Sequence, residues 1–228
     1  MSEEILNAKT ENLFDLTHTV AAQLLKDTVY PWEILPSIGS FIEKLLATLN
    51  KEEYNIINDN VYIAKTAKIA DNVSLTGPAL ICDNAELRPG AFIRGNVIVG
   101  KNSVVGNSCE VKNAIIFDCV QVPHFNYVGD SVLGYRSHMG AGAVTSNVKS
   151  DKTNVAIKYG DKVIETGLKK VGAMLGDYVE IGCGSVLNPG TVIGRNTNVY
   201  PLSSVRGVIP ENSIYKTGGI TVEKQERR

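Results

Sequence analysis

The sequence predicts an all-β protein: a left-handed parallel β-helix of hexapeptide repeats with an N-terminal helical cap. An aliphatic residue returns every sixth position from residue 57, and a mostly small residue follows four positions after each one. Gly, Asn and Asp are frequent just behind the aliphatic position. A period of six fits neither a helix of 3.6 residues per turn nor an alternating strand. It fits a short strand and a tight turn, the unit of a hexapeptide β-helix.

The first run of repeats has ten matches at one period. Its aliphatic positions are Ile57, Ile63, Ile69, Leu75, Ile81, Leu87, Ile93, Val99, Val105 and Val111. The register then slips by one residue and continues through Ile116, Val122 and Val128, and it slips again to Leu133 and Met139. A second run comprises Leu175, Ile181, Leu187, Ile193, Val199 and Val205. Three hexads make one triangular coil, so we expect about five coils from residues 57–144 and about two from 175–210.

The chain divides into three parts. Residues 1–55 form an N-terminal helical segment, with apolar residues at helical spacing in 11–29 and 38–50. We expect it to cover the open strand edge of the first coil, the alternative being a docking site for a partner or substrate. Residues 56–215 form the β-helix, and 216–228 form a charged C-terminal tail.

A long insertion interrupts the β-helix at residues 145–172. Within it, "VAIKY-GD-KVIET" predicts a hairpin that turns at Gly160 and Asp161. Insertions of this length are more often functional than neutral, and this one carries six lysines. It is therefore either a solvated loop or a lid or anion-binding arm.

Composition excludes several classes of protein. Lys and Arg total 23, Asp and Glu total 24, and no basic tract occurs, which argues against a nucleic-acid partner. No apolar stretch approaches the roughly 20 residues that span a bilayer. The four cysteines include no C-x-x-C pair, so we expect no zinc ribbon and no disulfide framework. A reduced, cytoplasmic compartment is the simplest interpretation.

The β-helix resembles a known family through four segments: "VVGNSCEVKNAII", "PHFNYVGDSVLG", "MGAGAVTSN" and "VGAMLGDYVEIGCGSVLNPGTVIG". They are similar to the acetyltransferase domain of bifunctional N-acetylglucosamine-1-phosphate uridyltransferase/glucosamine-1-phosphate acetyltransferase. They are more similar still to the C-terminal domain of sugar-1-phosphate thymidylyltransferase-like proteins. The resemblance covers residues 57 to about 215. Its specific part is H-x-x-Y-x-G-D followed by G-A-G-x-x-x-x-N.

This resemblance implies an acetyl-CoA-dependent N-acetyltransferase that acts on an amino-sugar 1-phosphate as a homotrimer. The family's histidine falls on His124, a general base near neutral pH. Substrate-binding positions fall on Tyr127, Asn147 and the phosphate-binding Lys112. Backbone N–H groups of "MGAGA" are candidates to stabilise the oxyanion.

The phosphate-binding arginine is either Arg88 or Arg94. The local sequence around the arginine favours Arg88. However, Arg94 lies 18 residues before Lys112, which is one full coil, so Arg94 and Lys112 would share a corner. We therefore favour Arg94. His138 stands at a substrate-binding position that is asparagine in the glucosamine-1-phosphate enzymes. The resemblance therefore does not identify which amino sugar is the substrate.

The resemblance places the CoA-binding groove at Ala141, Cys183 and Pro201, and it implies no metal. Cys183 departs from the family, which has a small residue such as serine there. Residues 1–50 are too few for a nucleotidyltransferase domain, so such activity would belong to a separate partner.

Side-by-side packing of three chains is expected from apolar outward positions. These are Ile98, Val104, Phe117 and Tyr200. His124 lies two hexads after Lys112, and the sides of the triangle are about 18–20 Å long. We therefore expect a composite site, with His124 of one chain facing the phosphate corner of another and the 145–172 loop closing over both.

Two other functions fit the same fold. One is a non-catalytic trimeric β-helix that accompanies a separate sugar nucleotidyltransferase. The other is a zinc carbonic anhydrase, which needs three histidine ligands. Only His124 and His138 lie in the β-helix, which argues strongly against it.

Overall fold

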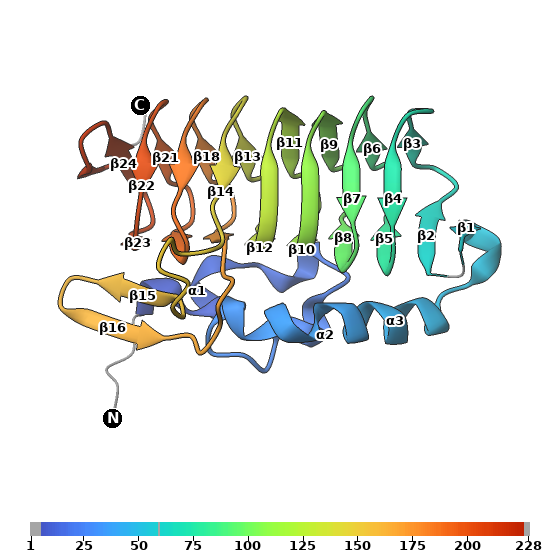
Figure 1. The fold of residues 1–228 in the computed structure, drawn as a ribbon, viewed down its shortest axis with the longest axis horizontal. Coiled ribbons are helices and arrows are strands. Elements are labelled where there is room, and N and C mark those ends of the chain that lie inside the picture. The colour runs from blue at the N-terminus through green and yellow to red at the C-terminus, as the bar shows by residue number, and fades with distance from the viewer. Residues whose placement is uncertain (1–5, 59, 226–228) are drawn as a thin grey trace.

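The computed structural model describes residues 6–58 and 60–225 of the 228. It is a mostly β solenoid of about nine turns, with an N-terminal helical region that runs along its side (Figure 1). The turn count exceeds our expectation of about seven. The β-helix prediction is confirmed.

The solenoid has three faces. The first face is a separate sheet: β3 (Lys68–Ile69), β6 (Glu86–Leu87), β9 (Val104–Asn107), β11 (Gln121–His124), β13 (His138–Met139), β18 (Glu180–Ile181), β21 (Asn198–Val199), β24 (Ser213–Lys216) and β25 (Ile220–Glu223). The second comprises β4 (Ser74–Thr76), β7 (Phe92–Arg94), β14 (Val144–Thr145), β19 (Val186–Leu187) and β22 (Ser204–Val205). The third comprises β2 (Val61–Ala64), β5 (Ala79–Ile81), β8 (Val97–Val99), β17 (Ala173–Leu175), β20 (Thr191–Ile193) and β23 (Val208–Ile209). Two longer strands, β10 (Glu110–Ile116) and β12 (Tyr127–Leu133), turn from the second face onto the third.

The strand register reproduces the sequence period. Most parallel partners are 18 residues apart, as in the pairs Ile93–Val111 and Glu180–Asn198. Two successive coils are one residue shorter, because Val111 pairs with Val128 and Gln121 pairs with His138. The slips in the sequence are therefore real features of the solenoid.

Glycines at some corners are required by the stacking of coils. A Cβ on Gly106 would lie 1.6 Å from the carbonyl oxygen of Pro123 in the next coil, and one on Gly182 would lie 2.4 Å from the nitrogen of Pro201. Both distances are far below a normal contact. A side chain at either position would force the coils apart.

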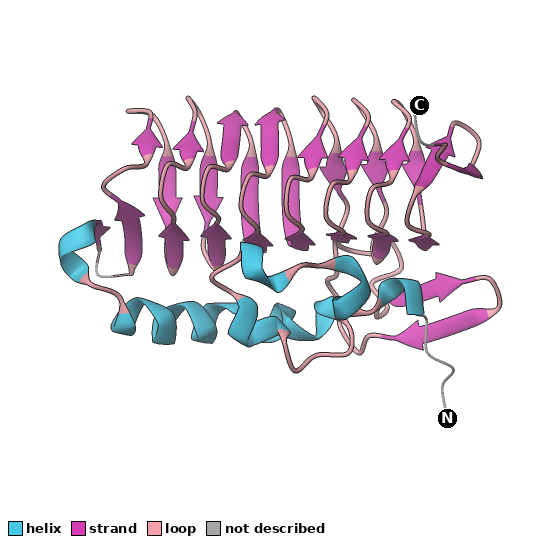
Figure 2. Ribbon diagram, turned by 180° about the vertical axis from the view of Figure 1, so that it is seen from behind, coloured by secondary structure: helices cyan, strands magenta, loops and turns pink. Residues whose placement is uncertain are grey.

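We had expected the N-terminal segment to cap the first coil, but the structure places it elsewhere. Its elements are η1 (Leu6–Ala8), α1 (Thr10–Leu13), η2 (Leu16–His18), α2 (Ala22–Leu25), η3 (Pro31–Ser37), α3 (Ile38–Thr48) and η4 (Lys51–Glu53). Region 11–29 is thus broken into short pieces, whereas 38–50 is largely the predicted helix. The helices lie along the third face (Figure 2), with α3 against β5, β8 and β10. The first edge is covered instead by β1 (Tyr54–Ile57), antiparallel to β2.

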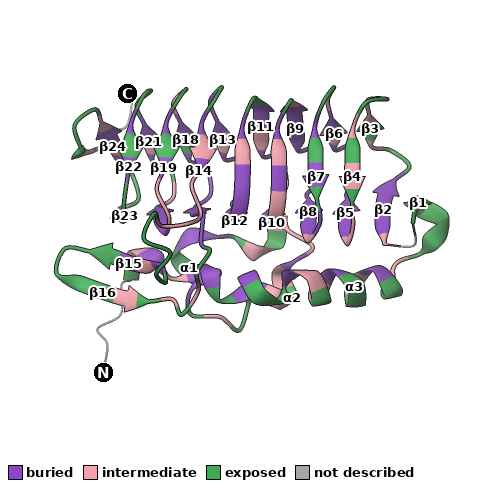
Figure 3. Ribbon diagram, viewed as in Figure 1, coloured by how far each residue is buried: buried purple, intermediate pink, exposed green. Residues whose placement is uncertain are grey.

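The apolar character of the third face explains this placement. Its strands are apolar on both sides, as in Val97, Ile98 and Val99, and all three residues are buried (Figure 3). Such continuous apolar runs mark strands covered on both faces. Phe14 of the segment packs on Phe117, with ring centroids 5.1 Å apart.

Because the N-terminal segment covers the third face, the surface that we expected for side-by-side packing of chains is wrong. Ile98 and Phe117 have no exposed surface, and Val104 is 8% exposed, so three of the four residues named for it are buried. Only Tyr200, at 44%, remains exposed. A contact between chains would have to use other surfaces.

The insertion contains the predicted hairpin, β15 (Ala156–Tyr159) paired with β16 (Lys162–Glu165). The hairpin packs against β23, and Val155 and Ile157 are buried there (Figure 1). Near the C-terminus, β25 folds back on β24, where the sequence suggested a tail. No helix of residues 6–58 and 60–225 is long and apolar enough to cross a membrane.

Candidate functional site

The two short coils place their missing residues at one corner, between the second and third faces. Here β10 and β12 continue around the corner with a single left-handed residue each, Asn113 (φ 47°) and Asp130 (φ 50°). Asn and Asp adopt this conformation more readily than other non-glycine residues. We call the segment of Lys112, Asn113, Gly129 and Asp130 the slipped corner.

The carboxylate of Asp130 organises the slipped corner. Its side chain is 6% exposed and lies 3.6 Å from Lys112 Nζ. Asn113 Nδ2 donates a hydrogen bond of 2.9 Å to Asp130 Oδ1, and Asn147 Nδ2 donates to Oδ2. Strand β12, which contains Asp130, thus contacts β10 and the start of the insertion through one buried acid.

Tyr127 and Asn147 also meet, as the resemblance implied. Asn147 Nδ2 donates to the Tyr127 hydroxyl oxygen at 3.2 Å. Burial, reinforced by the nearby negative charge of Asp130, raises the pKa of Tyr127 above its usual value. The phenol therefore stays protonated near neutral pH, and its O–H is available as a donor.

The two candidate phosphate ligands stack as expected. Ile93 pairs with Val111, which places Arg94 one coil from Lys112 on the same ridge. Arg94 Nη1 donates to Glu110 Oε1, and this hydrogen bond raises the pKa of the guanidinium. Arg88 lies just beyond β6 on the first face, bonded to Glu86 at 2.9 Å, so the two arginines belong to different faces.

His124 stands at the next corner, between the first and second faces. It is exposed, and Phe125 (φ 51°) turns the chain from His124 to Tyr127. The sequence-predicted site residues therefore form two groups, which this short turn connects. Lys112 and Asn147 both contact Asp130, and Asn147 in turn bonds to Tyr127, whereas His124 is in the adjoining strand.

The residues predicted for the CoA groove align with His124. Gly142 N–H donates to the His124 carbonyl, Gly184 N–H to that of Ala141, and Leu202 N–H to that of Cys183. These bonds put the following residues in one vertical column, which we call the His124 column: His124, Ala141, Cys183 and Pro201. It spans three coil steps, roughly 14 Å.

Three backbone N–H groups of the "MGAGA" segment are already engaged in hydrogen bonds. The N–H of Gly140 donates to Ile181, that of Gly142 to His124 and that of Ala143 to Gly140. An oxyanion would have to compete with these bonds for the three N–H groups. The N–H of Ala141, beside His124 in the next coil, has no hydrogen-bond partner among the described residues, so it stays a candidate donor together with the Tyr127 hydroxyl.

His138 lies apart from both groups, on the outer side of the first face. Its Nδ1 lies 2.8 Å from Glu180 Oε2, and the carboxylate accepts the hydrogen bond. The hairpin of the insertion packs against β23 rather than over His124, so the expected closure is not present in this conformation. Among the described residues no group of three or more His, Cys, Asp or Glu side chains forms a metal site.

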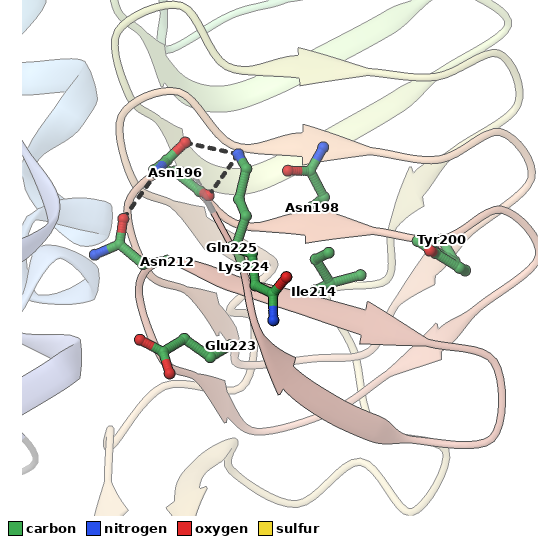
Figure 4. Close-up of a pocket in the computed structure, with 8 residues that line it drawn as sticks. All are labelled: Asn196, Asn198, Tyr200, Asn212, Ile214, Glu223, Lys224 and Gln225. Atoms are coloured by element: carbon green, nitrogen blue, oxygen red, sulfur yellow. Dashed lines mark hydrogen bonds between the residues drawn. The ribbon is translucent and has the colours of Figure 1, made fainter. Parts of the chain in front are cut away.

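A pocket of about 1030 Å³ lies at the C-terminal end of the first face (Figure 4). Asn196, Asn198 and Tyr200 line one side, and Lys224 bonds to Asn196 across it. None of the residues predicted for the site lines this pocket.

Sequence reasoning missed two acidic residues of the site, Asp130 and Glu110. Asp130 is the final residue of the quoted H-x-x-Y-x-G-D motif, but the motif gave it no role. Glu110 lies in the "EVKN" segment beside Lys112. The signal that could have found Asp130 is the register slip, which falls at the same corner.

The solenoid and its site define a hexapeptide-repeat β-helix protein of the acetyltransferase type, related to the C-terminal domain of sugar-1-phosphate nucleotidylyltransferase/acetyltransferases. The chain belongs to the family described as the GMPPB C-terminal domain, whose model matches residues 75–193.

Individual relatives agree with this assignment. A bifunctional protein GlmU of Methanococcus maripaludis is 38% identical over 202 residues, 87% of this chain and 49% of that protein. A bifunctional sugar-1-phosphate nucleotidylyltransferase/acetyltransferase of Sulfurisphaera tokodaii is 33% identical over 189 residues, 82% of this chain and 47% of that protein. The chain thus spans about half the length of the curated relatives it matches.

One solved structure with a related shape is a mutant of perosamine N-acetyltransferase from Caulobacter crescentus in complex with CoA and GDP-perosamine. It is 17% identical, with 73% of this chain and 57% of that chain covered and a TM-score of 0.34. This likeness is too distant to support an argument about function.

Proposed function

We propose that this protein is an acetyl-CoA-dependent N-acetyltransferase that acts on an amino-sugar 1-phosphate, such as glucosamine 1-phosphate. The observation that carries the proposal is the junction at Phe125, where the His124 column meets the group of Lys112, Tyr127 and Asn147. A base and a binding set for a phosphorylated sugar thus adjoin a narrow strip of small side chains.

The small side chains of the His124 column suit a slender thioester arm. Ala141, Cys183 and Pro201 would hold acetyl-CoA against the corner, with its thioester at His124. Acetyl-CoA supplies the activated acetyl group. The chain has only to orient the amine and manage one proton.

His124 acts as the general base in this proposal. Its imidazole takes the proton from the amine as the amine nitrogen bonds to the thioester carbonyl carbon, and returns a proton to the CoA sulfur when the C–S bond breaks and the thiol leaves. Tyr127 O–H donates to oxygen on the substrate. Arg94 and Lys112 contact the sugar phosphate: Arg94 exchanges its present carboxylate partner for the phosphate, whereas Lys112 keeps Asp130 and donates to the phosphate with another of its three ammonium hydrogens.

A homotrimer with a composite site belongs to the same proposal: His124 of one chain would serve the group of Lys112, Tyr127 and Asn147 in its neighbour, since the turn at Phe125 brings both groups to one region of the surface. The third face is closed by the N-terminal segment, so packing would use the first two faces and the corner between them. Two large apolar side chains stand out at this corner, Phe125 at 63% exposed and Leu202 at 79% exposed. Such exposure suits an interface between copies of the chain.

A thiol-release assay with acetyl-CoA and a panel of amino-sugar 1-phosphates tests the proposal. We expect release with at least one sugar, and a loss of about 10²–10⁴-fold in kcat for His124→Ala at unchanged native mass. Release that is absent with every sugar, or equal in His124→Ala, refutes it.

The second candidate function is a non-catalytic β-helix that accompanies a separate sugar nucleotidyltransferase. It is favoured by the ion pairs Arg94–Glu110 and Lys112–Asp130, which already neutralise both candidate phosphate ligands. Calorimetry with acetyl-CoA separates the two functions, because only the enzyme needs to bind it.

A further inference from the structure

Asp130 is the most heavily engaged acidic side chain of the slipped corner, and no role has been assigned to it. Three side chains from two segments converge on its carboxylate: Lys112 and Asn113 of β10, and Asn147 of the insertion. Its carbonyl also accepts from Gly172 N–H at 2.7 Å, where the insertion rejoins the solenoid. Both ends of the insertion are thus tied to one residue.

The carboxylate determines what Asn147 presents. One amide nitrogen, Nδ2, donates both to Asp130 and to the Tyr127 hydroxyl oxygen, which uses both of its hydrogens. The side-chain oxygen Oδ1 of Asn147 and the O–H of Tyr127 are then directed elsewhere. Among the described residues neither has a hydrogen-bond partner for that role, so they form an acceptor and a donor next to one another.

The same carboxylate restrains Lys112. A lysine ammonium sits on a flexible stem that can adopt many rotamers. A buried charge 3.6 Å away holds Nζ on the ridge shared with Arg94. Asn113 extends the connection, because its Nδ2 also donates to Leu35 O of the N-terminal segment at 3.3 Å.

We infer that Asp130 is a positioning residue for the proposed acetyl transfer: without contacting substrate, it orients Lys112, Asn147 and, through Asn147, Tyr127. The inference rests on the proposed function. The carboxylate is buried behind these three side chains, so its effect on a ligand passes through them.

The test is Asp130→Asn, assayed with glucosamine 1-phosphate, or whichever amino-sugar 1-phosphate the wild type prefers, and acetyl-CoA. Asn keeps the volume and tolerates the left-handed backbone, but its NH₂ group opposes donors that now converge on a carboxylate. A charged hydrogen bond is worth about 1.5–3 kcal/mol, so we expect KM for the sugar phosphate to rise about 10–100-fold. KM for acetyl-CoA should stay within about two-fold of the wild type, since the His124 column is untouched.

Asp177→Asn is the matched control. Asp177 is equally buried beside a cation, at 3.5 Å from Arg195, but it lies at the corner between the third and first faces. It should lower the unfolding temperature and leave both KM values unchanged. If Asp130→Asn does not fold, Asn113→Gly replaces it: this change removes one of the three donors at a left-handed position, and it should raise only the sugar-phosphate KM.

The outcomes are distinct. A selective rise in the sugar-phosphate KM supports the inference. An active wild type with unchanged kinetics in the folded variant, or equal rises in both KM values, overturns the inference alone. A wild type that transfers no acetyl group to any amino-sugar phosphate overturns the proposed function and the inference with it.

Discussion

Replacing Asp177 should loosen the N-terminal segment before the solenoid unfolds. This acid is 3% exposed, and its oxygens accept from Asp15 N–H at 2.7 Å and from Tyr135 N–H at 2.8 Å. Asp15 belongs to the N-terminal segment, and Tyr135 belongs to the solenoid. Asp177→Ala leaves two buried donors unsatisfied, at about 1–3 kcal/mol each. Because burial of the charge already costs stability, we expect a net loss of about 2–4 kcal/mol.

The single tryptophan makes this loss measurable by region. Trp32 is buried in the N-terminal segment, so its fluorescence reports on that segment, whereas far-UV circular dichroism reports on the whole β solenoid. In urea, Asp177→Ala should move the fluorescence transition to lower concentration than the dichroism transition. Coincident transitions at the wild-type midpoint would refute the anchoring role of Asp177.

The pH dependence provides a second check. Burial raises the pKa of Asp177 above its ordinary value of 3.8. A group with a raised folded-state pKa contributes stability that is fully present below the unfolded pKa and is lost as pH rises through the folded value. The wild type should therefore exceed Asp177→Asn in stability by more below the ordinary pKa of 3.8 than near about pH 7. A difference that is constant with pH contradicts this.

Three further predictions concern the proposed site. Arg94→Ala should raise KM for the sugar phosphate by the equivalent of about 1.5–3 kcal/mol, and Arg88→Ala should matter less; calorimetry of sugar-phosphate binding ranks them, and the reverse order would assign the phosphate to the first face. Mixing His124→Ala with Lys112→Ala subunits should recover activity above either parent, because some interfaces carry both native residues; mixed trimers without recovery exclude a shared site. Iodoacetamide should alkylate the exposed Cys183, and acetyl-CoA should slow this reaction in a mass-spectrometric time course; equal rates would remove Cys183 from the CoA groove.

The β-helix was predictable because its period is encoded in single residues. Each coil needs one buried aliphatic residue per side, so Ile93, Val111 and Val128 announce their stacking directly. The same arithmetic aligned Arg94 with Lys112, and the structure has them in register.

The placement of the N-terminal segment was not predictable from its own residues. Apolar spacing in 11–29 shows that a surface is buried but not which surface. The missing information lay in the solenoid: a strand such as "VIV" at 97–99 is apolar on both sides and needs a cover. The repeat analysis counted Ile98 as an outward residue free to meet another chain.

The contacts within the candidate site could not be predicted from the sequence. His124, Tyr127 and Asn147 were assigned through the family resemblance, and their roles stay predictions. Their organiser, Asp130, was not assigned, because its importance comes from convergence of three side chains that are distant in sequence. The only sign of this buried acid in the sequence is the one-residue shift of the hexapeptide register at the same corner.

The insertion shows how a solenoid separates length from position. His138 and Glu180 are 42 residues apart in sequence, yet they are direct partners in neighbouring strands. The coils before and after the insertion at 145–172 pair in the same parallel register as they would without the inserted residues. In such a fold, residues can be inserted or exchanged at a corner without changing the register of the strands in the coils on either side. The removal of a single residue, as at the slipped corner, changes the local shape and leaves every later coil aligned.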